Sequence, residues 1–229
     1  MKKRDLYPTV MVDIAIFCVD DNGLQVLLVQ RSNEPEKGLW ALPGGFLKPD
    51  EDASLESAAR RVLDEKIGVV IPHLEEVCTF SGKHRDPRGW SIGVLYFALL
   101  PRDQVTAAVK KKVDAVLWVD ARGHGLTMAF DHDAQLNKAL SVLTAKVERH
   151  VLPLHLMPAQ FTLTALQKTC ETILGYALDK SAFRRRLHPD PARFPAHVSE
   201  LVKVEHAQER GRQRPAQIYK AREGFVFME

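Results

Sequence analysis

Cysteine is scarce in this sequence of 229 residues, and the three cysteines lie far apart. Cys18, Cys78 and Cys170 are odd in number and lack the close spacing of metal ligands, so we expect buried, reduced thiols rather than a disulfide framework or a zinc cluster. Long apolar runs are also missing, because residues 14–19 form only a strand-length run, against the roughly 18 apolar residues of a membrane-spanning helix. The composition therefore excludes a membrane protein.

A secretory signal is missing as well. The basic N-terminus, residues 1–5, is followed by Leu6, Tyr7, Pro8 and Thr9 rather than by an apolar segment with a cleavage site, so we expect a cytoplasmic protein. Hydrophobic residues make up 45% of the chain and charged residues 27%, which favours one large or two small folded domains over a disordered or fibrous chain.

The net charge of +3 is unevenly distributed along the chain. Residues 1–150 contain 20 Lys and Arg against 21 Asp and Glu, a net charge of −1, whereas residues 151–229 contain 12 against 8, a net charge of +4. Within residues 180–222 there are 11 basic and 4 acidic residues, a net charge of +7. A basic C-terminal module indicates a polyanionic partner such as nucleic acid.

Strand and helix signals alternate through residues 1–130. Residues 11–19 and 24–29 are apolar, β-branched runs, and the Asn22-Gly23 pair between them favours the tight turn of a β-hairpin. A helix is predicted from Ser54, as its N-cap, to about residue 66, with Gly68 ending it. Further strands are predicted at residues 69–71, 77–80, 92–100 and 116–119. This pattern predicts an α/β domain with a mixed sheet.

The pattern changes after residue 130. Residues 131–152 are predicted as a linking helix with Asp131 or Asp133 as its cap, and its apolar stripe consists of Leu136, Leu140, Leu143 and Val147. Helices at residues 162–174 and 180–188, separated by a turn that contains Gly175, predict a helix-turn-helix. Strands at residues 202–205 and 216–220, joined by a basic loop, then predict a wing. Residues 153–229 are therefore expected to form a small α+β winged helix-turn-helix domain.

One segment of the first domain resembles the Nudix box, a motif of diphosphate-cleaving enzymes. The residues that fit its pattern are Gly45, Glu51, Arg61, Leu63, Glu65, Gly68 and Val69. The match requires two extra residues after Glu51, which we assign to Asp52 and Ala53. It fails at two positions where the motif has glutamate, because this chain has Val62 and Lys66 there.

These two departures bear directly on catalysis. Carboxylates at positions 62, 65 and 66 would share one helix face and converge on divalent cations that polarise a diphosphate. Val62 removes one ligand, and Lys66 places a fixed cation where a metal ion would sit, so Glu65 could form only a weak Mg²⁺ site. We therefore predict lost or marginal hydrolysis, with Glu51, Arg61 and Glu65 as vestigial catalytic residues, no metal site and no required cofactor. Mg²⁺ would be needed only if hydrolysis is retained. Arg61 and Glu65 could equally form an ordinary helix-surface pair.

Two other stretches indicate a particular branch of this superfamily. Residues 80–90 are similar to a loop of ADP-ribose-handling Nudix proteins, and residues 161–219 carry the matching helix and wing segments. Together with the degraded motif, the chain resembles the Nudix-related transcriptional regulators over nearly all of residues 8–220. In that family a Nudix α/β/α sandwich with a mixed sheet senses a ligand and a winged helix binds DNA. We accordingly place the sensing domain at residues 1–130.

The resemblance implies a regulator, usually a repressor, of genes for NAD metabolism or sugar catabolism that responds to ADP-ribose, a related nucleotide or a sugar. A pocket that keeps its glycine walls but loses its metal carboxylates would bind a nucleoside diphosphate without cutting it. Trp40 and Phe46 could stack on a base or pack in the core. The candidate effector-binding residues are Arg31, Trp40, Gly44, Gly45, Phe46, Lys66, Arg85, Asp86 and Arg88.

For DNA binding, the second helix of the helix-turn-helix would act as the recognition helix. Phe183 and Leu187 should face the domain core. The outward positions are Lys180, Ser181, Arg184 and Arg185, and the wing adds Arg210, Arg212 and Arg214 as contacts to phosphates or to the minor groove. The family implies a homodimer on double-stranded operator DNA.

The chief alternative is a Mg²⁺-dependent Nudix hydrolase of the ADP-ribose pyrophosphatase type with an accessory C-terminal module. A third possibility is a bifunctional protein that cleaves ADP-ribose and binds DNA. Val62 and Lys66 favour the regulator.

Overall fold

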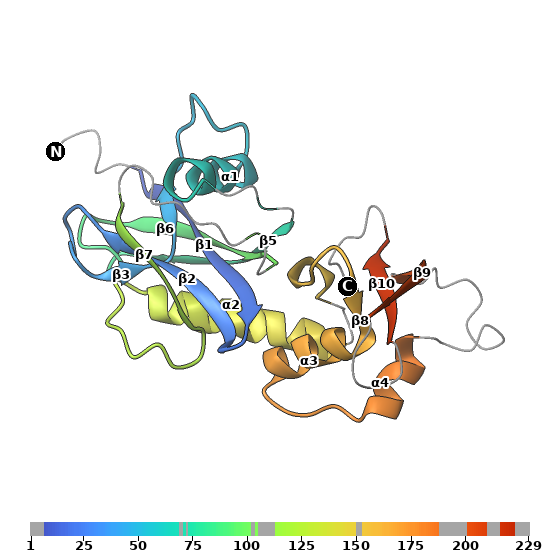
Figure 1. The fold of residues 1–229 in the computed structure, drawn as a ribbon. Helices are drawn as coiled ribbons and strands as arrows, with labels where there is room; N and C mark the ends of the chain where they lie inside the picture. Colours follow the sequence, from blue (N-terminus) through green and yellow to red (C-terminus); the bar gives the residue numbers. More distant parts are fainter. Residues whose placement is uncertain are drawn as a thin grey trace. The chain divides into compact units, whose positions relative to one another are not determined.

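The computed structural model describes residues 7–68, 71, 73–101, 104, 113–149, 153–187, 201–209 and 216–222. The chain divides into two compact units, Met1–Leu143 and Thr144–Glu229, and the boundary falls inside the long helix α2 (His132–Glu148). Figure 1 shows the elements of both units along the chain.

The first unit is built on a seven-stranded sheet. Its strands are β1 (Thr9–Asp20), β2 (Gly23–Arg31), β3 (Trp40–Ala41), β4 (Gly44–Phe46), β5 (His73–Gly82), β6 (Ser91–Leu99) and β7 (Val113–Asp120). They pair in the order β3-β2-β1-β6-β5, while β4 also pairs with β1 and β7 with β2. Because β1 runs parallel to β6 and antiparallel to β2, the sheet is mixed, as predicted.

The predicted hairpin and first helix are confirmed. Asp20 and Gly23 face each other at the end of the β1–β2 ladder, and Gly23 adopts a positive φ of 111°, which glycine accommodates without steric cost. Helix α1 (Leu55–Lys66) begins after Ser54, which forms a capping box with Ser57. Gly68, with φ 74°, follows the end of the helix.

Two helices cover opposite faces of the sheet (Figure 1). Val12, Ile14 and Ile16 of β1 belong to a core cluster that also contains Val62 and Leu63 of α1. Side chains alternate across a strand, so the intervening residues face the other side. There the Asp13 carboxylate accepts a hydrogen bond of 3.2 Å from Gln135 of α2. The first unit is therefore the predicted α/β/α sandwich.

The sequence patterns misplaced some boundaries. The two short strands β3 and β4 lie where no strand was predicted, and β5 begins at His73 rather than residue 77. Glu75 and Glu76 obscure the start of β5, which tolerates them because it lies at a sheet edge. Ile71 is not in a strand, and the rest of the predicted strand at 69–71 lies outside the described residues.

The second unit contains the predicted helix-turn-helix. After a single 3-10 turn, η3 (Leu154–Leu156), come β8 (Phe161–Thr162), α3 (Leu163–Leu174), α4 (Lys180–Leu187), β9 (Leu201–Glu209) and β10 (Ala216–Ala221). Thr162 caps α3, and Gly175 ends it in the left-handed conformation with φ 81°. The Asp179 side chain accepts a hydrogen bond of 2.7 Å from Ala182 N, which confirms Asp179 as the cap of α4.

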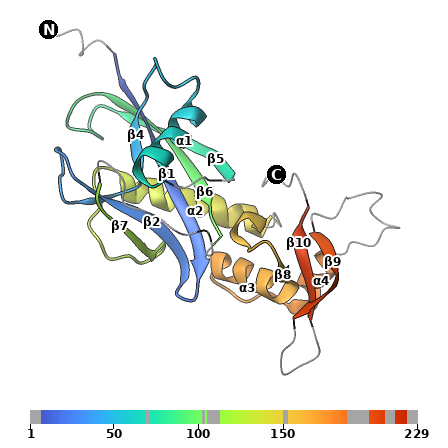
Figure 2. The ribbon, with the colours of Figure 1, turned by 45° about the horizontal axis from the view of Figure 1, so that its top comes forward.

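Strands β9 and β10 pair antiparallel and form the predicted wing, while the two-residue strand β8 was not predicted and pairs with β10 (Figure 2). The buried side chains of this unit include Phe161, Leu166, Ile173, Phe183 and Tyr219. A helix-turn-helix with a short sheet packed around one apolar cluster is therefore a winged helix fold, as expected.

The cysteines and the helix lengths agree largely with the sequence analysis. Cys18 and Cys170 are buried and form no disulfide, whereas Cys78 is only half-buried, so the expectation of burial was wrong for that residue. Among the described residues, no helix combines the length and apolar character needed to cross a bilayer.

Candidate functional site

A cavity of about 350 Å³ lies in the first unit and gathers most of the predicted effector-binding residues. Those that line it are Arg31, Gly44, Gly45, Phe46, Lys66, Arg85, Asp86 and Arg88. The predicted vestigial residues Arg61 and Glu65 line it as well. Trp40 lies on β3 and Glu51 before α1, and neither is among the residues that line the cavity, so an effector contact by Trp40 stays a prediction.

The two glycines of β4 let the backbone approach neighbouring elements closely. A Cβ atom on Gly44 would overlap Asp13 Oδ1 and lie 2.9 Å from Val12 O, and a Cβ atom on Gly45 would lie 2.7 Å from Val62 Cγ2. Glycine is therefore required at both positions for β4 to pack against β1 and α1. The packing of Val62 against Gly45 also places an apolar side chain where the Nudix box has a metal-binding glutamate.

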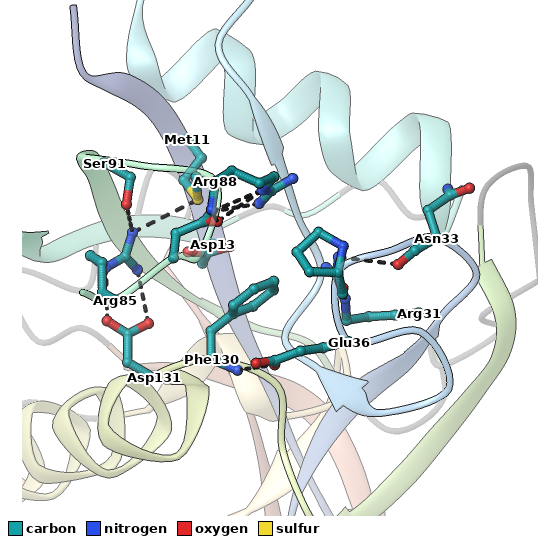
Figure 3. A network of polar contacts seen from close by, with 12 residues as sticks. Met11, Asp13, Arg31, Asn33, Glu36, Arg85, Arg88, Ser91, Phe130 and Asp131 are labelled. Carbon is teal, nitrogen blue, oxygen red and sulfur yellow. Dashed lines mark hydrogen bonds and ion pairs between the residues drawn. The ribbon is translucent and has the colours of Figure 1, made fainter. Parts of the chain in front are cut away.

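Arg85 is held rigidly in the cavity wall (Figure 3). Its guanidinium donates two hydrogen bonds of 2.8 Å to the Asp131 carboxylate and a third of 3.3 Å to Ser91 Oγ. Gly93 allows this position, because a Cβ atom there would lie 2.8 Å from Arg85 Nη2. The Arg85 side chain is 8% exposed and paired with Asp131, which fixes its position in the wall, and its contact with an effector stays a prediction.

Arg88 lies over two aromatic rings. Its Cζ atom lies 5.0 Å from the Phe46 ring centroid and 5.6 Å from that of Phe130. Asp86 orients it through hydrogen bonds of 2.9 Å from Nε and 2.6 Å from Nη2. Burial alone would raise the pKa of Asp86, but the hydrogen bonds from Arg88 outweigh it and hold that pKa below its usual value.

Phe130 carries a second cation on its ring. Arg31 Cζ lies 4.6 Å from the Phe130 centroid, and the Arg31 guanidinium donates to the Pro35 carbonyl at 2.8 and 3.1 Å. Burial and the nearby charge of Arg88 lower the pKa of Arg31. Two guanidinium groups that lie near one ring and repel each other favour an anionic ligand, because an anion close to both would relieve the repulsion.

A carboxylate corner, which we define as Lys48, Glu51, Asp52, Arg61 and Glu65, forms another part of the site. Lys48 Nζ lies 2.9 Å from Glu51 Oε2 and 3.0 Å from Glu65 Oε1. Its hydrogen bond is the main reason that the pKa of Glu65 is lowered, and the two carboxylates in turn raise the pKa of Lys48. The cation between these carboxylates is Lys48, whereas the sequence analysis gave such a position to Lys66.

Arg61 neutralises the third carboxylate of this corner. Its Nε and Nη2 atoms donate to the two Asp52 oxygens at 2.7 and 2.8 Å, and its Nη1 donates to Glu65 at 3.3 Å. The Asp52 side chain is 1% exposed. The hydrogen bond from Arg61 is the main reason that the pKa of Asp52 falls to about 2 from its usual 3.8. Asp52, assigned to an insertion by the sequence analysis, is thus a structural anchor for Arg61.

Asp52 should make the stability of the first unit depend on acidic pH. Because its pKa is lower in the folded than in the unfolded protein, its contribution is complete above about pH 4 and is lost as the pH falls through about 2. We expect Asp52→Asn to lower the thermal unfolding midpoint at pH 7 and the difference from wild type to shrink toward pH 2. Melting curves across this range measure it. A difference that is independent of pH would contradict the assignment.

The corner does not fit a divalent metal ion. Oxygen ligands for Mg²⁺ must be available to the ion, yet both Asp52 oxygens and one oxygen each of Glu51 and Glu65 already accept hydrogen bonds from Lys48 or Arg61. Across the described ranges, no group of three or more His, Cys, Asp or Glu residues is arranged to hold a metal ion. A divalent ion would therefore have to displace Lys48 or Arg61 from these carboxylates.

Several site residues were missed by the sequence analysis. Phe130, His132 and Asp13 line the cavity, and Asp131 holds Arg85. His132 accepts a hydrogen bond of 3.0 Å from Leu42 N at Nδ1, and burial lowers its pKa. These residues lie far along the chain from the glycine-rich segment, so no local pattern marks them. Lys48, three residues before Glu51, was detectable as a charge of opposite sign within the motif.

The second candidate site is the outward face of α4. Lys180, Ser181, Arg184 and Arg185 are exposed, as predicted, while Phe183 is buried. Leu187 is only half-buried. The preceding turn is fixed by Glu171, whose Oε1 accepts hydrogen bonds from Gln167 Nε2 at 2.9 Å and from Leu178 N at 2.8 Å. A rigid turn that presents exposed cations on one helix suits insertion into a DNA groove.

The predicted wing cations fall outside the described part of the chain. Arg210, Arg212 and Arg214 belong to the connection between β9 and β10, of which only the flanking strands are described. Their role in DNA binding stays a prediction.

The matches to known families divide the chain into the same two parts as the two compact units of the structure. Residues 10–139 match the NUDIX domain, and residues 153–221 match the NrtR DNA-binding winged helix domain. The two matches cover the cavity and the helix-turn-helix, respectively.

Individual relatives cover nearly the whole chain. A protein of Acinetobacter baylyi named ADPR responsive transcriptional repressor NtrR is 41% identical over 213 residues, which are 93% of this chain and 82% of the relative. Shewanella oneidensis NrtR complexed with a 27mer DNA aligns with a TM-score of 0.77 and 35% identity over 93% of each chain. The NUDIX domain of that protein complexed with ADP ribose aligns with a TM-score of 0.57 and 40% identity, over 62% of this chain and 93% of that one.

Proposed function

Because the chain belongs to the family that joins a NUDIX domain to an NrtR DNA-binding winged helix domain, we propose that it is an ADP-ribose-responsive transcriptional repressor. Its first unit binds ADP-ribose in the cavity without cleaving it, and its second unit binds operator DNA. The observation that carries the proposal is the joint presence, in one chain, of a cavity lined by cations and aromatic rings and of a helix-turn-helix with an exposed basic recognition helix.

The chemistry of the cavity suits ADP-ribose. Guanidinium groups form paired hydrogen bonds with phosphate oxygens, and Arg31 and Arg88 line the cavity. Phe46, which is 47% exposed, offers a ring face for a base. Lys48 and Lys66 add positive charge. A neutral sugar would use few of these cations, so the cavity favours a nucleotide.

Helix α2 provides a covalent route from the cavity to the second unit. Phe130 and His132 line the cavity, and Asp131 between them holds Arg85. Phe130 has a positive φ of 52°, and its backbone N–H donates to Glu36 Oε2 at 2.5 Å. A ligand that moves Phe130 or Arg88 would therefore act on the first turn of α2, and α2 continues into the second unit.

The proposal also covers the location of the protein, its oligomeric state and the genes that it controls. It acts in the cytoplasm as a homodimer on a two-fold operator, controls genes of NAD metabolism or sugar catabolism, and requires no cofactor. Repression would end when ADP-ribose binds, because the ligand-bound protein no longer holds the recognition helices in the geometry that the operator requires.

Fluorescence anisotropy with a labelled duplex tests this function. The duplex is selected from a random-sequence library by the protein itself, so that the test does not depend on knowing the regulated gene. We expect binding about a thousandfold tighter than to a scrambled duplex at near-physiological salt, and loss of binding on addition of ADP-ribose. If the library yields no preferred sequence, the protein is not a specific repressor.

A further inference from the structure

We propose that Lys48 is the resident cation of the effector's diphosphate site, so that this protein binds ADP-ribose without a divalent metal ion. The inference rests on the proposed function, because it assigns a cation to the ligand of that site. Lys48 lines the cavity, is 36% exposed and is held between Glu51 and Glu65. A cation held by two carboxylates beside an anion-binding cavity has the arrangement of a bound metal ion, with an ammonium group as the charge.

The hydrogen-bonding capacity of Lys48 supports a direct contact with phosphate. An ammonium group has three N–H donors. Two of those of Lys48 are used by Glu51 at 2.9 Å and Glu65 at 3.0 Å. The third can therefore donate to a phosphate oxygen in the cavity while the carboxylates keep the side chain in place. Such a charge-assisted hydrogen bond is stronger than one between neutral groups.

The charge balance of the site shows why no metal ion is needed. Lys48, Arg61 and Lys66 balance Glu51, Asp52 and Glu65, which gives these residues a net charge of zero. Glutamates at positions 62 and 66, as in the Nudix box, would give the same set a net charge of −3. The hydrolase pattern requires divalent cations to bring a diphosphate near its carboxylates, whereas here the cation is part of the chain.

A divalent ion would also have to compete with contacts that already exist. Asp52 Oδ1 accepts from Arg61 Nε at 2.7 Å, and Asp52 Oδ2 accepts from Arg61 Nη2 and from Lys48 N, both at 2.8 Å. Replacing Lys48 by glutamate would place three carboxylates, at positions 48, 51 and 65, around the position of the present ammonium group. The identity of residue 48 thus determines whether the carboxylates bind an ammonium group of the chain or a metal ion.

Mn²⁺ binding to the full-length protein tests the proposal without any nucleotide. The concentration of free Mn²⁺ is measured from its electron paramagnetic resonance spectrum, and we expect wild type to leave it unchanged. The charge-matched control Lys37→Glu, which alters an exposed lysine outside the cavity lining, should also leave it unchanged. Lys48→Glu should bind about one equivalent. Saturable Mn²⁺ binding by wild type that is lost in Glu65→Gln would overturn the proposal.

ADP-ribose binding by calorimetry supplies the second readout. Wild type should bind with the same affinity, within about twofold, in EDTA and in Mg²⁺. Lys48→Glu should bind about tenfold or more weakly in EDTA and recover affinity with Mn²⁺, while Lys37→Glu should behave as wild type. Wild-type binding that requires Mg²⁺ would overturn the proposal, as would a Lys48→Glu variant equal to its control.

Two further comparisons separate a failure of this proposal from misfolding of the variant and from a failure of the proposed function. If Lys48→Glu does not melt cooperatively, Lys48→Gln is used, which removes the charge and keeps the length, and it should lose affinity in EDTA to a similar extent. A wild type that binds no ADP-ribose in either buffer contradicts the proposed function, whereas the Mn²⁺ measurement still decides the role of Lys48.

Discussion

Replacing Arg184 with alanine is expected to weaken operator binding about tenfold to a hundredfold and to relax base preference at one position of each half-site. Arg184 is exposed on α4, directly after Phe183, which is buried and anchors the helix. A guanidinium in this position can donate two parallel hydrogen bonds to one guanine in the major groove, and alanine leaves those acceptors without partners. The loss should therefore depend on sequence.

Two comparisons separate base reading from general charge. Arg185→Ala on the same exposed face should weaken binding to all sequences alike and lower the salt dependence by about one phosphate contact. Lys138→Ala, an exposed cation of α2 in the first unit, should have no effect. Anisotropy titrations at several salt concentrations, with single-base variants of the duplex, measure these effects. An Arg184→Ala protein that behaves as the Lys138→Ala control would remove α4 from the DNA interface.

The other large effect is expected from Arg88→Ala, which should raise the ADP-ribose concentration needed to release the operator about tenfold to a hundredfold. The change removes a cation that lies over the rings of Phe46 and Phe130, and it leaves the carboxylate of Asp86, which is 5% exposed, without the guanidinium that balances its charge. A buried carboxylate beside the cavity whose charge is no longer balanced also repels a diphosphate. Ligand affinity should therefore fall for two reasons.

Operator binding without ligand provides the internal reference for this variant. Arg88 belongs to the first unit, so we expect the operator affinity of Arg88→Ala to stay within about threefold of wild type. Lys83→Ala, an exposed residue of the same loop that does not line the cavity, should respond to ADP-ribose normally. Equal responses of Arg88→Ala and Lys83→Ala would show that the Phe46–Arg88–Phe130 stack has no part in effector binding.

Local sequence patterns predicted those elements whose contacts are local. The Asn22-Gly23 turn, the Ser54 cap and the Gly175 helix end each depend on hydrogen bonds or φ values within a few residues. The outward positions of α4 followed from helical spacing once Phe183 was placed in the core. Such features can be predicted because their physical causes lie within one turn of the chain.

The cavity is formed by contacts between residues far apart in the sequence, which local patterns cannot predict. Arg85 meets Asp131 across 46 positions of sequence, and Phe130 N meets Glu36 across 94. Arg85 was expected to contact the effector, yet its guanidinium is paired with Asp131. Phe46 and Trp40 looked alike in sequence, but Phe46 stacks on Arg88 while Trp40 pairs on β3 outside the cavity lining.

The degraded Nudix motif also contains a contact that the sequence pattern did not predict, although its residues lie closer together in the chain. The sequence indicated that Lys66 supplies the cation in place of metal, since it occupies a glutamate position of the Nudix box. In the structure, Lys48 bridges two of the motif carboxylates and reaches Glu65 across 17 positions, while Lys66 also lines the cavity. That a cation of the chain replaces the metal ion stays a prediction, and the contacts of Lys48 could be found only from the fold of the loop before α1.

Operator release by ADP-ribose, followed over time with Mg²⁺ present, tests the central claim most directly. The protein is bound to its labelled operator, ADP-ribose is added once in modest excess, and anisotropy is recorded for hours while the nucleotide is assayed by chromatography. A sensor that binds without cleaving predicts release that persists, with ADP-ribose recovered intact. No release, or release that reverses as AMP and ribose 5-phosphate accumulate, would contradict the account.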